Sequence, residues 1–210
     1  MRKYRFSVLF LSFTLLAFVF TAGPAAASTP EFTDVSGWYA GAVNSLAEKG
    51  VMTGYSDGTF RPNGPVTRGM FVTLLYRLSG ASGSSANPFS DVPAGSWYEN
   101  AIAWAAENGL VQGVGGQRFA PDRCITREQF ASILWNYAKY KGIDVSIGED
   151  TNILSYNDAF SISDFAFPGL QWACGAGIMD GDTAGNLNPR GSATRAQVAV
   201  MLERFLTAQN

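Results

Sequence analysis

The sequence predicts a mainly helical fold built from three related helix-loop-helix units. A Thr-Arg pair recurs at Thr67, Thr126 and Thr194, and apolar residues follow each Thr after four, seven, eight and eleven positions. That spacing is typical of the buried face of one helix. A turn-rich segment and a shorter apolar helix pattern precede each copy. A two-helix unit of this size buries little surface alone, so we expect the three units to share one core.

The first 27 residues are predicted to be a secretory signal peptide. Three basic residues within the first five positions precede an apolar run at 6–20, and Ala25-Ala26-Ala27 offers a cleavage site. The run is shorter than the roughly 20 residues that a membrane-spanning helix needs, which favours cleavage over retention as an anchor. The mature chain is then 28–210, exported and without a membrane segment.

The composition of the mature chain limits its partners. Without the three basic residues of the leader, 12 of the 15 Lys and Arg remain against 17 Asp and Glu, a net charge near −5. Such a chain lacks the basic field that attracts nucleic acid or an anionic membrane surface. It contains no His, which removes His-based triads and metal sites, and its acid pairs lack the surroundings of a glycosidase cleft. We expect no catalysis, metal or cofactor.

The repeated units are set out in the same order. Gly50, Gly54, Phe60, Pro62 and Thr67 recur 59 positions later, and most recur again after a further 68. Each unit opens on an aromatic-x-Asp segment, continues through a short helix that ends at a glycine, and closes with the Thr-Arg helix. The expected bounds are 31–78, 88–140 and 155–207, with 28–210 acting as one domain.

Each Thr lies where a helix N-cap is expected. Gln129 and Gln197 follow their Thr by three positions and complete a capping box, whereas Met70 interrupts the box of unit one. The Arg that follows each Thr lies beside helix N–H groups that favour anions.

Two further features leave structural questions open. Cys124 and Cys174 would join units two and three if they paired, and two small buried thiols explain them equally well. The segment 180–186 resembles the start of a calcium loop, but Ala184 and Gly191 stand where ligands are needed, so we interpret it as a turn.

Taken together, segments of the type F-x-D-v…W…G-x-x-x-G…F-x-P…T-R, repeated three times between Glu31 and Phe205 with substitutions, resemble the surface-layer homology (SLH) family. The resemblance implies a pseudo-threefold domain, with the Thr-Arg helices as a central three-helix bundle and the other helices as outer prongs. It also implies a non-catalytic module of the bacterial cell wall or S-layer surface. In the family, grooves between repeats bind acidic, often pyruvylated, secondary cell-wall polysaccharide linked to peptidoglycan.

The resemblance assigns ligand-binding roles to several groups of residues. They are the arginines Arg68, Arg127 and Arg195, the opening acids Asp34, Asp91 and Asp158, the aromatics Trp38 and Trp97, and the glycines Gly54, Gly113 and Gly181. Phe165 replaces the Trp of unit three, Val114-Gly115-Gly116 departs from the loop motif of unit two, and Gly69-Met70 departs from the helix start of unit one. Unit two is expected to keep the fullest combination, Asp91, Trp97 and Arg127.

Structural alternatives stand beside these roles. In the first alternative, each Arg ties two units together through a salt bridge to an opening Asp. In the second, each Asp caps the short helix or forms an Asx turn. In the third, the tryptophans belong to the core, as tryptophans more often do, rather than forming sugar platforms. The alternative functions are an assembly protein that binds other surface proteins, or a wall-active hydrolase.

Overall fold

The computed structural model describes residues 31–83, 86–146, 148 and 150–209. Over these residues the protein is mainly helical, which confirms the predicted class, and the described part forms isolated β-bridges rather than strands. The predicted signal peptide, residues 1–27, lies outside the described residues. No helix within the described ranges is both long and apolar enough to cross a membrane.

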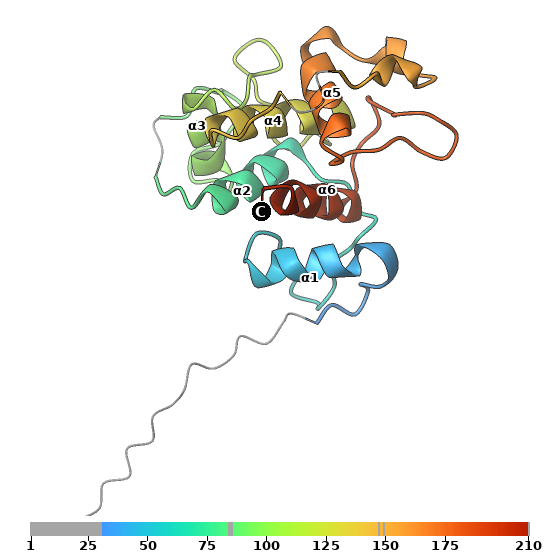
Figure 1. Cartoon of the computed structure of the whole chain (residues 1–210). Helices are drawn as coiled ribbons and strands as arrows, with labels where there is room; N and C mark the ends of the chain where they lie inside the picture. The colour runs from blue at the N-terminus through green and yellow to red at the C-terminus, as the bar shows by residue number, and fades with distance from the viewer. Residues whose placement is uncertain (1–30, 84–85, 147, 149, 210) are drawn as a thin grey trace, which may run out of the picture.

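Each repeat contributes one short and one longer helix (Figure 1). The short helices are α1 (Ala40–Glu48), α3 (Glu99–Glu107) and α5 (Phe167–Gly175), and the longer ones, here called the Thr-Arg helices, are α2 (Arg68–Ser79), α4 (Arg127–Tyr140) and α6 (Arg195–Thr207). Single 3-10 turns span Gly37–Tyr39, Ile153–Ser155, Ala159–Ser161 and Asp164–Ala166.

The predicted helix caps are confirmed. The Thr126 hydroxyl accepts a hydrogen bond from the Gln129 N–H, and the Gln129 side chain accepts one from the Thr126 N–H. Thr194 and Gln197 form the same capping box. Thr67 accepts from the Met70 N–H alone, because the Met side chain cannot return the bond.

The apolar face of each Thr-Arg helix is buried, and the three faces belong to one core. Aromatic side chains bridge the helices. The rings of Phe71 and Phe130 have centroids 4.5 Å apart, and those of Tyr137 and Phe205 are 6.0 Å apart. The central helices therefore meet through large side chains rather than through closely spaced backbones.

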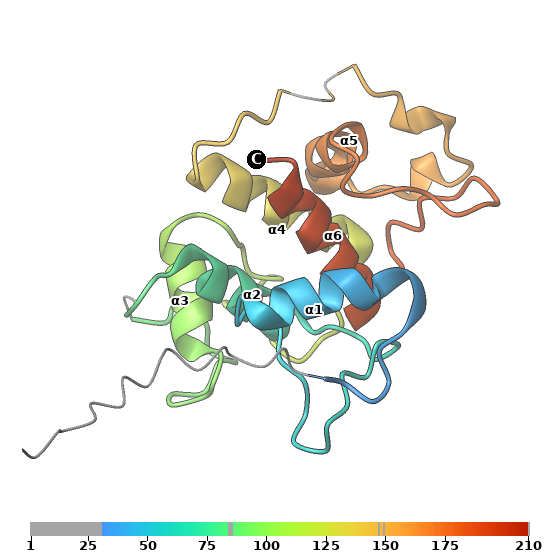
Figure 2. The same ribbon diagram turned by 60° about the horizontal axis from the view of Figure 1, so that its bottom comes forward.

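The repeats are arranged as a closed ring. Each Thr-Arg helix packs on the short helix of the next repeat: α2 on α3, α4 on α5, and α6 on α1 (Figures 1 and 2). Because the last helix of the chain packs on the first, repeat three completes the ring with repeat one.

A triangle of backbone hydrogen bonds lies at the centre of this ring. The Val66 N–H donates to Ala193 O (3.1 Å), the Ala193 N–H to Ile125 O (3.1 Å), and the Ile125 N–H to Val66 O (2.8 Å). Each of these residues lies two positions before a Thr-Arg helix and is buried. The triangle therefore aligns the starts of the three helices.

Both cysteines are free thiols, so the bridge between repeats two and three is not formed. Cys174 lies in α5, where burial raises the pKa of its thiol to about 11. A thiol with so high a pKa is largely protonated at neutral pH and a poor nucleophile.

One strained backbone position offers a test of the repeat alignment. Gln117 has a left-handed φ of 55°, where Gly58 and Gly185 occupy the equivalent positions. Left-handed backbone costs a residue other than Gly about 1 kcal/mol or more. We predict that Gln117→Gly raises the free energy of unfolding by about 1 kcal/mol in urea titrations. Gln112→Gly, without a left-handed φ to relieve, serves as the control, and an equal gain there would contradict the interpretation.

Candidate functional site

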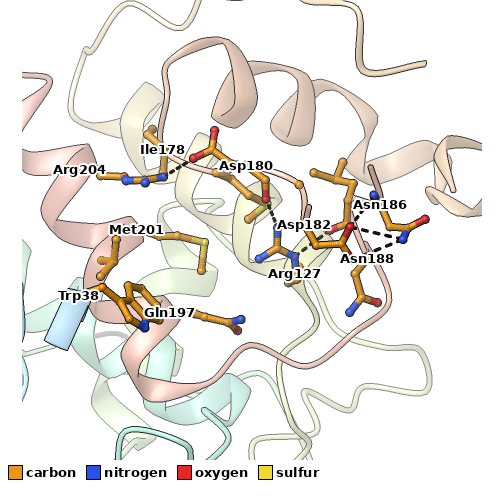
Figure 3. A pocket seen from close by; sticks show the side chains of 14 residues that line it. Trp38, Arg127, Ile178, Asp180, Asp182, Asn186, Asn188, Gln197, Met201 and Arg204 are labelled. Atoms are coloured by element: carbon orange, nitrogen blue, oxygen red, sulfur yellow. Dashed lines mark hydrogen bonds and ion pairs between the residues drawn. The ribbon is translucent and has the colours of Figure 1, made fainter. Parts of the chain in front are cut away.

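Three grooves lie on the outer faces of the Thr-Arg helices. The α6 groove, a cavity of about 300 Å³, is lined by Trp38, Arg127, loop residues between 178 and 188, and α6 (Figure 3). The α4 groove, about 460 Å³, is lined by Phe165, Arg68, loop 110–114 and α4. The α2 groove, about 170 Å³, is lined by Trp97, Arg195, loop 53–55 and α2.

Every groove draws on all three repeats. In the α6 groove the arginine belongs to repeat two, the loop and helix to repeat three, and the exposed aromatic residue to repeat one. Trp97 and Arg127, which belong to the same repeat in the sequence, line different grooves. Because the repeats pack as a ring, each arginine and each exposed aromatic residue lines the groove on the Thr-Arg helix of a neighbouring repeat.

Each motif arginine donates two hydrogen bonds to carbonyls of the next repeat. Arg68 Nε donates to Phe119 O (2.9 Å), and its terminal nitrogen donates to Gln112 O (3.2 Å). The equivalent contacts join Arg127 to Leu187 and Asp180, and Arg195 to Phe60 and Thr53. Burial lowers the pKa of Arg68 to about 10, so its guanidinium remains charged at neutral pH. A guanidinium has five N–H donors, so part of each one is left for a ligand.

The backbone N–H groups at the helix starts are also occupied. The N–H groups of Arg68 and Gly69 donate to Arg123 O and Pro121 O, each at 2.9 Å. The next N–H, that of Met70, donates to the Thr67 hydroxyl. In repeat two, the N–H groups of Arg127 and Glu128 donate to Gly191 O and Pro189 O. In repeat three, those of Arg195 and Ala196 donate to Gly64 O and Pro62 O. These donors hold the neighbouring repeat, so the helix starts do not present free N–H groups to an anion.

The opening aspartates hold the same loops from the opposite side. Both carboxylate oxygens of Asp34 accept backbone bonds, from the N–H groups of Phe60 (2.7 Å) and Arg61 (2.8 Å). The Phe60 bond is the main reason that the pKa of Asp34 lies below its usual value. Asp91 binds Phe119 and Ala120 in this way, and Asp158 binds Leu187 and Asn188. The second residue of each pair, such as Arg61 with a φ of 57°, is left-handed.

The structural alternatives for Arg and Asp are therefore correct only in part. Each arginine does tie two repeats together, but through carbonyls rather than through an opening aspartate. The carboxylates do not cap the short helices, whose N-cap residues are Tyr39, Tyr98 and Ala166. None of the three opening aspartates lines one of the three grooves. Their contacts hold the loops that form the groove walls.

The motif glycines line the grooves and make room for an aromatic ring. A Cβ on Gly54 would lie 2.2 Å from a ring carbon of Phe32, and one on Gly181 would lie 2.3 Å from a ring carbon of Tyr156. A Cβ on Gly113 would lie 2.7 Å from Arg118 O. The close approach at these glycines is thus made by the protein's own side chains and loop carbonyls.

The groove aromatics are unusually exposed for their size. Trp38, Trp97 and Phe165 expose 69%, 63% and 60% of their surface, whereas Trp104 and Trp172 are buried in the core. Large aromatic side chains at corresponding places in three repeats, each at the edge of a groove, suit stacking against a ligand ring.

Sequence reasoning missed the polar residues on the outer faces of the Thr-Arg helices. Arg77, Asn136 and Arg204 each lie ten positions after the cap Thr and line the α2, α4 and α6 grooves. Arg204 also pairs with Asp180 at 2.7 Å, as the dashed line in Figure 3 shows. The signal was the constant spacing of a polar residue from the cap Thr.

The segment 180–186 is a turn, as interpreted. Asp182 accepts hydrogen bonds from the N–H groups of Ala184 and Asn186, both at 2.9 Å. Within the described residues, no group of three or more His, Cys, Asp or Glu side chains is placed to hold a metal ion.

The recurring groove geometry agrees with what sequence comparison shows. The S-layer homology domain matches residues 31–69, 88–131 and 155–199, one match in each structural repeat. The chain belongs to the S-layer homology domain family.

Similar proteins include surface-layer proteins and enzymes. The chain is 31% identical over 184 residues to a Surface-layer 125 kDa protein of Lysinibacillus sphaericus, covering 86% of this chain and 15% of that protein. It is 36% identical over 178 residues to an Endoglucanase of Bacillus sp. (strain KSM-635), covering 83% of this chain and 18% of the enzyme. It also resembles S-layer protein EA1 of Bacillus anthracis, at 32% identity over 53% of this chain and 13% of that protein. The chain thus spans less than a fifth of these relatives, and the likeness supports a cell-wall anchoring module at the cell surface.

The aspartate contacts predict an acid-sensitive fold. Burial raises the pKa of Asp91, but its bonds from the Phe119 and Ala120 N–H groups outweigh burial and lower it overall. A carboxyl whose pKa is lower in the folded state stabilises the fold above its unfolded pKa, and this contribution is lost as pH falls through the folded pKa. We predict that Asp91→Asn lowers the free energy of unfolding by about 1–3 kcal/mol at neutral pH.

The difference between wild type and Asp91→Asn should shrink below the ordinary Asp pKa of 3.8, as urea titrations across a pH series would measure. Asp122→Asn is the matched control, because Asp122 is an exposed residue of the same loop. A difference for Asp91→Asn that stays constant down to the lowest pH would contradict the assigned role of the charged carboxylate.

Proposed function

We propose that this chain is a non-catalytic anchoring module that binds an acidic, pyruvylated secondary cell-wall polysaccharide through the grooves between its repeats. The observation that carries the proposal is the threefold recurrence of an exposed aromatic ring beside a guanidinium with unused donors. The polysaccharide is linked to peptidoglycan, so binding would hold the exported protein at the bacterial cell wall after removal of residues 1–27.

The groove chemistry matches an acidic sugar. A guanidinium offers planar paired donors that fit a carboxylate such as a pyruvyl group, and an aromatic face covers the apolar side of a sugar ring. The loops that carry Gly54, Gly113 and Gly181 bring backbone close to the same space. The guanidinium selects for a negative charge and the aromatic face for a sugar ring, so together they favour an acidic sugar.

The α2 groove is best suited to the acid group. Arg195 and Arg77 both line it, together with Trp97, and among the described residues no carboxylate belongs to its lining. Arg77 donates to Val51 O through one nitrogen, which leaves further donors of an exposed guanidinium. Two cations and no acid at the lining make this the strongest local attraction for an anion.

The likeness to enzymes is compatible with a non-catalytic role. The aligned part covers only 18% of the Endoglucanase and 16% of the Exoglucanase XynX of Acetivibrio thermocellus. We infer that the shared part is the anchor. Other surface proteins are secondary partners in this proposal, and a wall-free pull-down would identify them.

The proposal predicts sedimentation of the purified protein with native wall sacculi. Removing the polysaccharide or its pyruvyl groups chemically should abolish the sedimentation, since the carboxylate that the arginines bind is lost. Sedimentation that survives removal of the pyruvyl groups would overturn the acidic-sugar proposal.

A pair of aromatic variants tests the grooves directly. Trp97→Ala should weaken wall binding about tenfold, the effect of losing roughly 1.4 kcal/mol of stacking. Phe160→Ala is the matched control, because Phe160 is 97% exposed yet lines none of the three grooves. Equal losses in binding isotherms to sacculi would indicate non-specific adhesion of exposed aromatic residues.

A further inference from the structure

The α6 groove continues into a second hollow of about 420 Å³. Trp38, Val200 and Arg204 line both hollows, so the two form one elongated depression, here called the α6 cleft. The second hollow is lined largely by small side chains, those of Ala42, Ala176 and Ala208, while Thr207 and Glu203 supply polar groups. Trp38 faces both parts with 69% of its surface exposed.

The charges along the α6 cleft cancel. In the first hollow Arg204 is paired with Asp180 at 2.7 Å, and Asp182 lies on the same lining as Arg127 (Figure 3). Arg127 also gives two of its donors to backbone carbonyls. In the second hollow Glu203 is paired with Lys49 at 3.4 Å. No net positive charge is therefore left along the cleft to attract an acid group.

The α2 groove differs at the corresponding positions. Where repeat three has Asp180 and Asp182, repeat one has Thr53 and Tyr55. Within the part of the chain that the structure describes, Arg77 and Arg195 therefore face no carboxylate in the groove lining. An anion entering the α2 groove meets two cations, whereas one entering the α6 cleft must displace Asp180 from Arg204. The two sites are thus related by the fold and opposite in their preference for charge.

We propose that the α6 cleft binds two consecutive neutral N-acetylated sugar residues, while the acid group of the glycan binds in the α2 groove. This inference rests on the proposed wall-binding function and divides it between unequal sites. Trp38 stacks on the sugar pair at the junction of the hollows. The alanine side chains take an acetamido methyl group, and Glu203 and Thr207 accept hydrogen bonds from sugar hydroxyls.

The test uses two tryptophan signals as local reporters. The indole N–H resonances of Trp38 and Trp97 are assigned by their loss in Trp38→Phe and Trp97→Phe. The mature chain is then titrated with N,N′-diacetylchitobiose, N-acetylglucosamine and pyruvylated N-acetylmannosamine. The chitobiose should shift the Trp38 signal and bind at least about fivefold tighter than the monosaccharide, because the second ring adds contact area.

The acidic monosaccharide should shift the Trp97 signal and leave that of Trp38 unchanged. Added salt should weaken binding of the acidic sugar and leave binding of chitobiose unaltered. If chitobiose does not shift Trp38, or if the acidic sugar shifts Trp38 as strongly as Trp97, the inference is overturned. If the acidic sugar shifts neither signal and native sacculi do not retain the protein, the proposed function fails instead, so the two failures can be told apart.

A filled second hollow provides the variant test. Thr207→Trp places a large side chain in that hollow, and it should remove the advantage of chitobiose over N-acetylglucosamine without changing the affinity for the monosaccharide. Gln209→Trp adds the same side chain to an exposed position near the end of α6 that lines neither hollow. A chitobiose advantage that persists in Thr207→Trp, with thermal unfolding unchanged, would show that the second hollow is not a sugar site.

Discussion

The structure depends on one loop residue in each repeat that is held from both sides. The N–H of Phe60, for example, donates to Asp34 of its own repeat, and the carbonyl of Phe60 accepts from Arg195 of the preceding repeat in the ring. Hydrogen bonds to charged groups contribute about 1.5–3 kcal/mol each, more than the cost of the left-handed residue that follows. Loop conformation and contact between repeats are consequently set at the same point. Loss of the carboxylate would release the loop, and the arginine would then lose its acceptor.

Because the motif arginines have both a structural and a binding role, a substitution at one of them does not separate ligand binding from folding. Arg68, Arg127 and Arg195 hold the groove walls in place and also present unused donors to the grooves, so an alanine at any of them removes both functions at once. Residues on the outer helix faces and the exposed aromatics have fewer structural contacts. Trp38 and Trp97 in particular contact a neighbouring tyrosine ring and keep most of their surface exposed. These positions separate ligand binding from folding.

Local features were readable from the sequence because they depend on spacing within one segment. The Thr caps, the capping boxes at Gln129 and Gln197 and the buried helix faces all follow from neighbours within one or two turns. The assignment of side chains to grooves was not readable in this way. It depends on which repeat each helix packs against, and a repeat pattern alone does not say whether Trp97 meets Arg127 or Arg195. The carbonyl acceptors of the arginines were also hidden, because a backbone acceptor has no residue-type signature.

Closure of the ring has a consequence for the site as a whole. Each groove takes its arginine, its loop and helix, and its aromatic residue from three different repeats, so removing any one repeat leaves no groove complete. The same removal opens the triangle of Val66, Ile125 and Ala193, and it takes away the carbonyl acceptors of N–H groups at a helix start. It also uncovers apolar residues of the shared core, so stability and binding would be lost together. Sequence divergence among the repeats, such as Phe165 in place of Trp or Asp180 beside Arg204, can therefore tune one groove without loosening the ring that forms all three.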